Sequence, residues 1–127
     1  MSRVAAPSGL QFRLQLGGST AVVTEVGAAN RVLDTAFADL RPGEDGGTAI
    51  TLRSPGGREV SLWMDAAYRY VELSTGDSPP EVHRRRRGLG VEPMTAAPNA
   101  FRTGDGLCVL APCESASAAW AIRPGSN

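Results

Sequence analysis

The sequence contains no lysine, a single histidine and only two cysteines, Cys108 and Cys113. One histidine with two cysteines is too few for a structural zinc site, so we expect reduced thiols and no bound metal. The 13 arginines are balanced by 13 acidic residues, and this zero net charge creates no field that would attract nucleic acid. No apolar run approaches the ~18 residues that span a bilayer, so we expect no membrane partner. Residues 1–9 lack the apolar run of a secretory signal, which predicts a cytoplasmic protein.

Helical periodicity is also missing, because no segment of about 12 residues repeats its apolar positions every ~3.6 residues. The 15 glycines and 9 prolines favour frequent turns between short strands. The clearest predicted unit is a hairpin of residues 48–53 and 60–64, joined by the turn sequence SPGG at 54–57. Further strands are predicted over residues 10–16, 21–23, 68–75, 89–94, 107–110 and 116–122. We therefore expect one all-β domain over residues 1–127, built as an antiparallel β-sandwich.

Several strings, in order along the chain, resemble the aldose 1-epimerase (galactose mutarotase) family. They are LDTAF at 33–37, LSTGD at 73–77, RGLGVEPMT at 87–95, AAPNAF at 96–101, GD at 104–105 and LAPCES at 110–115, with Trp120 after them. The resemblance covers residues 33–122. It implies the C-terminal half of a mutarotase-like supersandwich whose concave face binds a free sugar, and it implies that an N-terminal half with the family's histidines is absent.

The resemblance also assigns roles to two acidic residues. In that family a glutamate takes the proton of the anomeric hydroxyl and a histidine protonates the ring oxygen, so the sugar opens and recloses as the other anomer. Glu92 matches the glutamate, and Asp34 matches an aspartate that accepts hydrogen bonds from sugar hydroxyls. This implies an isomerase for an aldose such as glucose or galactose, without a metal or an organic cofactor. Because one proton-transfer group contributes about 10²–10⁴-fold, a chain without the histidine should be weakly active or inactive alone.

Each candidate residue also has a structural interpretation. Glu92 could be an ion-paired carboxylate, and Asp34 could cap a turn. His83 precedes four arginines at 84–87, in a polar segment that we expect to be an exposed loop rather than a proton donor. The arginines could bind a phosphate or contact another chain, although a solvated loop is favoured. Four aromatic residues could stack on a sugar, although packing within the protein is favoured: Trp63, Tyr68, Tyr70 and Trp120.

A second hypothesis comes from a different class of function. The chain could be a non-catalytic remnant that binds carbohydrate, or that assembles with another chain or as a homodimer. Such assembly would use sheet surface that an absent half would otherwise cover.

Overall fold

The computed structural model describes residues 11–16, 19–23, 32–53, 57–85 and 88–125. In chain order these residues form β1 (Gln11–Leu16), β2 (Ser19–Val23), β3 (Asp34–Phe37), β4 (Thr48–Arg53), β5 (Glu59–Met64), β6 (Tyr70–Ser74), the 3-10 turn η1 (Val82–Arg84), β7 (Gly90–Met94), α1 (Ala100–Thr103) and β8 (Trp120–Pro124). The predicted all-β class is confirmed, and the longest helix in the described part has four residues. None of the described helices is long and apolar enough to cross a membrane.

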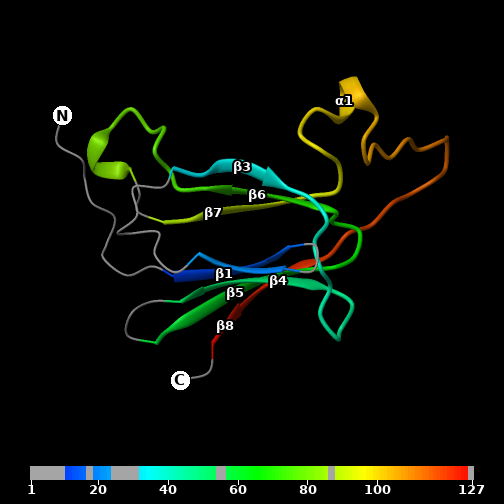
Figure 1. Ribbon diagram of the computed structural model, residues 1–127. Helices are drawn as coiled ribbons and strands as arrows, with labels where there is room; N and C mark the ends of the chain where they lie inside the picture. Colours follow the sequence, from blue (N-terminus) through cyan, green and yellow to red (C-terminus); the bar gives the residue numbers. More distant parts are fainter. Residues whose placement is uncertain (1–10, 17–18, 24–31, 54–56, 86–87, 126–127) are drawn as a thin grey trace.

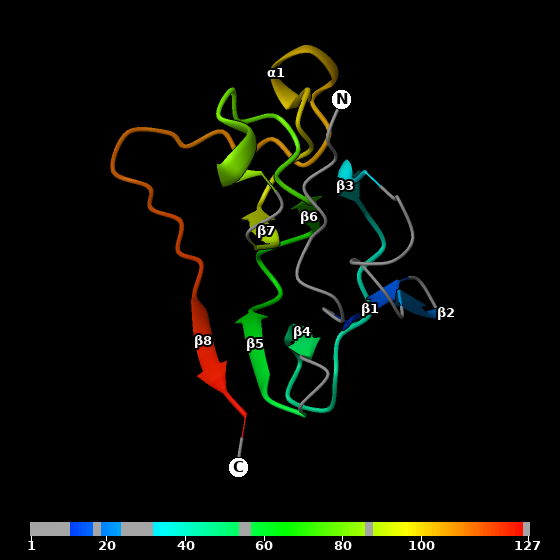
Figure 2. The ribbon, with the colours of Figure 1, turned by 90° about the vertical axis from the view of Figure 1, so that its left-hand side faces the viewer.

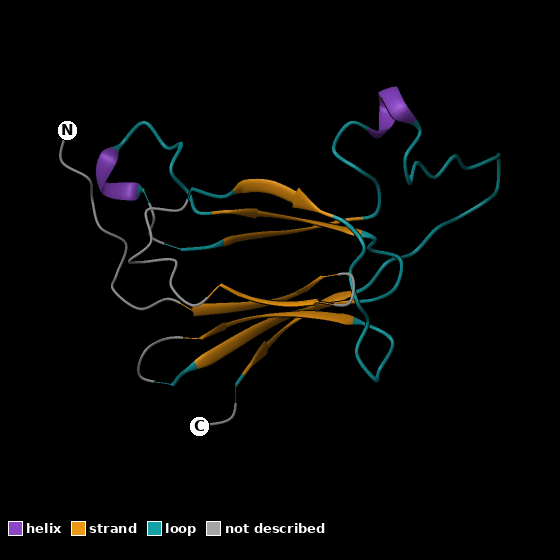
Figure 3. Cartoon of the chain, viewed as in Figure 1, coloured by secondary structure: helices purple, strands orange, loops and turns teal. Residues whose placement is uncertain are grey.

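The strands form two antiparallel sheets that lie one above the other (Figures 1 and 3). Sheet A has the strand order β2-β1-β4-β5-β8, and sheet B has the order β3-β6-β7. The predicted hairpin is confirmed as β4 and β5, with Ile50 opposite Leu62. Its connecting residues 54–56 lie outside the described part of the chain.

The core lies between the two sheets. Sheet A contributes the buried side chains of Ile50 and Met64, and sheet B contributes those of Val71 and Leu73. Because alternate residues of a strand point to opposite faces, β6 directs Val71 and Leu73 inward and Glu72 outward. Apolar side chains that are partly buried surround this cluster: Leu33, Phe37, Leu40, Leu52, Leu62, Tyr68, Leu89 and Val91. Both sheets therefore share one small core.

Sheet A is wider than sheet B, and its β8 edge carries exposed apolar side chains. Trp120 lies opposite the core residue Met64, and Ile122 lies opposite Leu62, so both belong to the core-facing side of sheet A. Trp120 is nevertheless 57% exposed and Ile122 is 62% exposed. Figure 2 shows β8 on the outer side of β5. The described strands of sheet B thus leave the side chains of β8 largely uncovered.

Two sequence-based expectations for the C-terminal region are wrong. Residues 107–110 were expected to form a strand but are irregular and exposed, and the last strand begins at Trp120 rather than at residue 116. The reason is the path of the chain, which leaves the end of sheet B and returns to sheet A along residues 107–119 (Figure 1). Among the described residues, no strand pairs with this connection until Asp65 donates its N–H to the Ala119 carbonyl oxygen at 3.0 Å. Pairing with β5 starts only there.

Strand β3 was not predicted as a strand, and a buried threonine fixes its position against β6. The Leu33 N–H donates to the Thr75 hydroxyl at 2.9 Å, and the Thr75 N–H donates to the Leu33 carbonyl oxygen at 2.9 Å. The same hydroxyl donates to the Asp77 carboxylate at 2.5 Å. Thr75 is only 1% exposed, so these bonds replace the water that its hydroxyl loses. The LSTGD string therefore has a structural role at the β3–β6 junction.

Candidate functional site

The two acidic residues singled out in the sequence lie on one face of sheet B. In the register of β6 and β7, Glu92 is directly opposite Glu72. In the register of β3 and β6, Asp34 is opposite Ser74, two residues further along β6 on the same face. This face points away from the core, because the intervening residue Leu73 points into it. We call it the outer face of sheet B.

Glu92 is exposed and stands beside a second carboxylate. Like charges placed directly opposite across two strands are unfavourable, so the Glu72–Glu92 pair does not itself stabilise the sheet. On the other side of Glu72 lies Ala36, whose single methyl group leaves the surroundings of that carboxylate open. Among the residues that the structure describes, no arginine forms an ion pair with Glu92. The ion-paired structural interpretation of Glu92 therefore gains no support from these residues.

Asp34 begins β3 and is exposed, so it lies in a strand rather than in a turn. Strand β6 lies between β3 and β7, so Asp34 and Glu92 are on the two outer strands of the three-stranded sheet B. With strands about 4.8 Å apart, the two backbones are separated by roughly 10 Å across the sheet. The two carboxylates can therefore face the same ligand only if it spans several ångströms of this surface.

The α1 segment borders the outer face at the Tyr70 end. Tyr70 donates its hydroxyl to the Asp105 carboxylate at 2.6 Å, and this hydrogen bond, together with burial, raises the pKa of Tyr70 above its usual value of 10.0. Gly106 has φ of 70° and packs on the tyrosine ring, where an added Cβ would lie 2.9 Å from Cε2. Only glycine adopts this conformation readily and permits such close approach. The GD string at 104–105 thus joins the α1 segment to β6.

The arginine-rich segment borders the opposite end of sheet B. Figure 1 shows η1 and α1 both on the outer side of this sheet, at its two ends. Arg84 pairs with Glu81 at 3.8 Å, and the Arg85 Nε–H donates to the Pro79 carbonyl oxygen at 2.7 Å. His83 is exposed in η1, as expected for a loop histidine. Arg86 and Arg87 lie outside the described residues.

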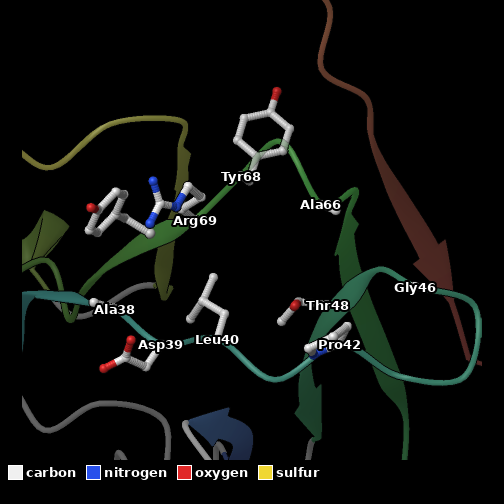
Figure 4. A pocket seen from close by; sticks show the side chains of 10 residues that line it. Ala38, Asp39, Leu40, Pro42, Gly46, Thr48, Ala66, Tyr68 and Arg69 are labelled. Carbon is white, nitrogen blue, oxygen red and sulfur yellow. The ribbon is translucent and has the colours of Figure 1, made fainter. Parts of the chain in front are cut away.

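A pocket of about 240 Å³ lies at the end of the sandwich, away from both predicted site residues. Its lining comes from three chain segments, residues 38–42, 46–48 and 66–70, and includes neither Glu92 nor Asp34. Figure 4 shows Tyr68 and Arg69 on one segment and Asp39, Leu40 and Pro42 along another, with Thr48 beside Leu40 and Pro42. Asp39 was not among the site residues predicted from the sequence. No local sequence pattern marks Asp39, because only the fold brings these three segments together. In the structure its φ of 55° is uncommon for a residue other than glycine.

The remaining candidates for chemistry lie apart from one another. Within the described ranges, no group of three or more His, Cys, Asp or Glu residues could hold a metal ion. Cys108 and Cys113 are free and exposed on the irregular C-terminal segment. Of the aromatic residues, Trp63 packs against the guanidinium of Arg123. The guanidinium carbon Cζ lies 5.0 Å from the centre of the tryptophan ring. That contact is intramolecular, which agrees with the packing role favoured for Trp63.

Searches with models of known protein families, against curated proteins and against solved structures gave no match.

Proposed function

We propose that the chain is a mutarotase-type protein in which Glu92 acts as the base that opens an aldose ring. The observation that carries the proposal is the position of Glu92, which is exposed on the outer face of sheet B and shares that face with Asp34. A proton acceptor must be free to approach the substrate hydroxyl, and an exposed strand residue meets that requirement. The family resemblance of residues 87–101 supplies the type of reaction.

The proposed reaction needs one proton taken and one proton given. Glu92 takes the proton of the anomeric hydroxyl, the bond between the anomeric carbon and the ring oxygen breaks, and a donor protonates the ring oxygen. Rotation of the resulting aldehyde and reclosure then yield the other anomer. His83 is the single histidine of the chain and is exposed in η1. Because the sequence indicates an exposed loop histidine rather than a proton donor, we assign the donor role to water or to another chain, which leaves the rate about 10²–10⁴-fold below that of a complete acid–base pair.

The substitution Glu92→Gln tests the proposal. We expect freshly dissolved α-glucose or α-galactose to equilibrate faster with the wild-type chain than in buffer, and this excess rate should disappear in the variant. The readout is the loss of optical rotation, with proton NMR exchange between the two anomers as the more sensitive measurement. Glu44→Gln is the control, because Glu44 is an exposed carboxylate away from the outer face. A variant with the full excess rate removes Glu92 from the mechanism.

A non-catalytic role in assembly is the second candidate, and the exposed edge of sheet A favours it. Trp120 and Ile122 would be covered if a further layer or a second copy of the chain packed on β8. We expect light scattering to detect a dimer whose proportion rises with concentration, and Ile122→Lys to shift the population to monomer. A monomer at all concentrations, together with an excess mutarotation rate, would exclude this candidate.

A further inference from the structure

We propose that the pocket at the end of the sandwich binds a single neutral, polyhydroxylated ring, at a site separate from Glu92. We call it the end pocket, lined by Ala38, Asp39, Leu40, Pro42, Gly46, Thr48, Ala66, Tyr68, Arg69 and Tyr70. The inference stands on this cavity alone and does not need Glu92 to be a base. It concerns binding, without a covalent step.

The walls of the end pocket are held by hydrogen bonds within the protein. The 43–47 turn is closed by two bonds, from the Gly43 N–H to the Gly47 carbonyl oxygen at 2.7 Å and from the Gly46 N–H to the Gly43 carbonyl oxygen at 3.1 Å. Tyr68 donates its N–H to the Asp65 carbonyl oxygen at 3.2 Å, and the Tyr70 hydroxyl donates to the Asp105 carboxylate at 2.6 Å. A ligand would therefore meet a pocket that is already formed, and its binding would cost little ordering of the protein.

The polar groups on the walls select a neutral ligand. Asp39 offers hydrogen-bond acceptors and Arg69 offers donors, and they are not within ion-pair distance of each other in the described structure. A phosphate attracted by Arg69 would be repelled by Asp39, and a cation attracted by Asp39 would be repelled by Arg69. A sugar hydroxyl both donates and accepts, so a pair of hydroxyls can satisfy both side chains at once. Figure 4 shows the two side chains on different segments, Arg69 just before β6 and Asp39 just after β3.

The apolar part of the lining fits the ring of such a ligand. Leu40, Pro42 and Ala66 provide aliphatic surface, and Tyr68 provides an aromatic ring beside Arg69. The C–H groups of a pyranose can pack on such surfaces while its hydroxyls reach the polar groups. The volume of about 240 Å³ lies below the ~300–1,000 Å³ typical of drug-sized ligands, so one ring fits better than an oligosaccharide.

The conformation of Asp39 agrees with a role in binding. Its φ of 55° places it in the left-handed region, which costs free energy for a residue with a side chain. Such conformations cluster at ligand sites, where the side chain must point in one direction. Here the residue with this conformation is an acidic residue of the end-pocket lining.

Titration with methyl α-glucopyranoside and methyl β-galactopyranoside tests the proposal, because these glycosides cannot mutarotate and their binding is independent of catalysis. We expect millimolar binding by isothermal titration, with NMR shifts at residues 38–42 and 66–70. Removing one charged partner should weaken binding about tenfold in Asp39→Asn and in Arg69→Gln. Glu44→Gln, in the adjacent turn but not in the lining, should bind as the wild type does.

Several results would overturn the proposal. One is unchanged glycoside affinity in Asp39→Asn and Arg69→Gln, provided that thermal melts show both variants folded. Another is a set of shifts that maps to β7 instead of the end pocket, since binding would then be at the outer face of sheet B. Inorganic phosphate that binds more tightly than the glycosides would assign the pocket to anions. Failure of the mutarotation assay leaves these measurements unaffected, so the two proposals fail separately.

Discussion

Strands β6 and β8 have the same length and both pair in antiparallel sheets, yet they differ completely in burial. In β6, Val71 and Leu73 are 0% exposed, whereas in β8 the equivalent core-facing residue Ile122 is 62% exposed. The difference comes from the second layer, because β6 is the central strand of sheet B and packs on sheet A, while β8 lies at an edge. An apolar residue in a strand therefore stabilises this fold only where the opposite sheet covers it.

The largest expected effect is the contrast between Leu73→Ala and Ile122→Ala. Leu73→Ala creates a cavity among the four buried apolar side chains that form the core cluster of the described residues, and it should cost about 2–5 kcal/mol of the free energy of unfolding. Ile122→Ala removes exposed surface and should cost about 0.5 kcal/mol or less. Denaturant unfolding of both variants measures the difference.

Measurements on the same two variants could also contradict the burial difference between β6 and β8. If Ile122→Ala is as destabilising as Leu73→Ala, the face of β8 must be covered in solution. Repeating the melts at several protein concentrations would then show whether a second copy covers it, because stability gained by association rises with concentration.

The parts of the fold that were predicted correctly depend on local signals. The β4–β5 hairpin is specified by alternation on both sides of a Pro-Gly sequence, and in β7 and the residue before it the apolar Leu89 and Val91 alternate with Gly90 and Glu92. The turn at residues 111–114, observed in the structure, also has a local cause. Proline at 112 presets the first turn position, and the Glu114 N–H donates to the Ala111 carbonyl oxygen at 3.0 Å. Cys113 takes the position with φ of 71°, which usually suits glycine.

The parts that were missed depend on contacts between distant residues. Strand β3 is short and lacks a clear apolar alternation, so its place beside β6 follows from Thr75, 42 residues from its partner Leu33. Residues 107–110 have the composition of a strand, but none of the described strands pairs with them. That Asp34 and Glu92 share a face follows from the register of two separate strand pairs, which no local pattern contains. The end pocket was missed for the same reason.

The second prediction concerns the end of β6. Thr75→Val keeps the shape of the side chain but removes the hydroxyl that accepts from the Leu33 N–H and donates to Asp77. Leaving the partly buried Leu33 N–H without this partner should cost about 1–3 kcal/mol, less than the cavity at Leu73. Thr35→Val, at an exposed position of β3, is the matched control and should change stability little. Equal effects of the two substitutions in urea unfolding would show that the Thr75 bonds do not stabilise the β3–β6 junction.

The smallest expected effect tests how β6 holds the α1 segment, and it is seen most clearly in its pH dependence. Tyr70→Phe removes the hydroxyl that donates to Asp105. The pKa of Tyr70 is raised in the folded protein, so its protonated form is favoured by folding and the stabilisation is complete below the usual pKa of 10.0. As the pH rises above that value the unfolded tyrosine loses its proton first, and the stabilisation is lost through the folded pKa. The difference in unfolding midpoint between wild type and Tyr70→Phe should therefore be constant near neutral pH and shrink above pH 10.0.

Tyr68→Phe serves as the control, because within the described chain no hydrogen bond to the Tyr68 hydroxyl is formed. If the Tyr70→Phe difference stays constant into the alkaline range, the α1 segment is held on β6 by packing of Gly106 on the ring rather than by the Asp105 bond.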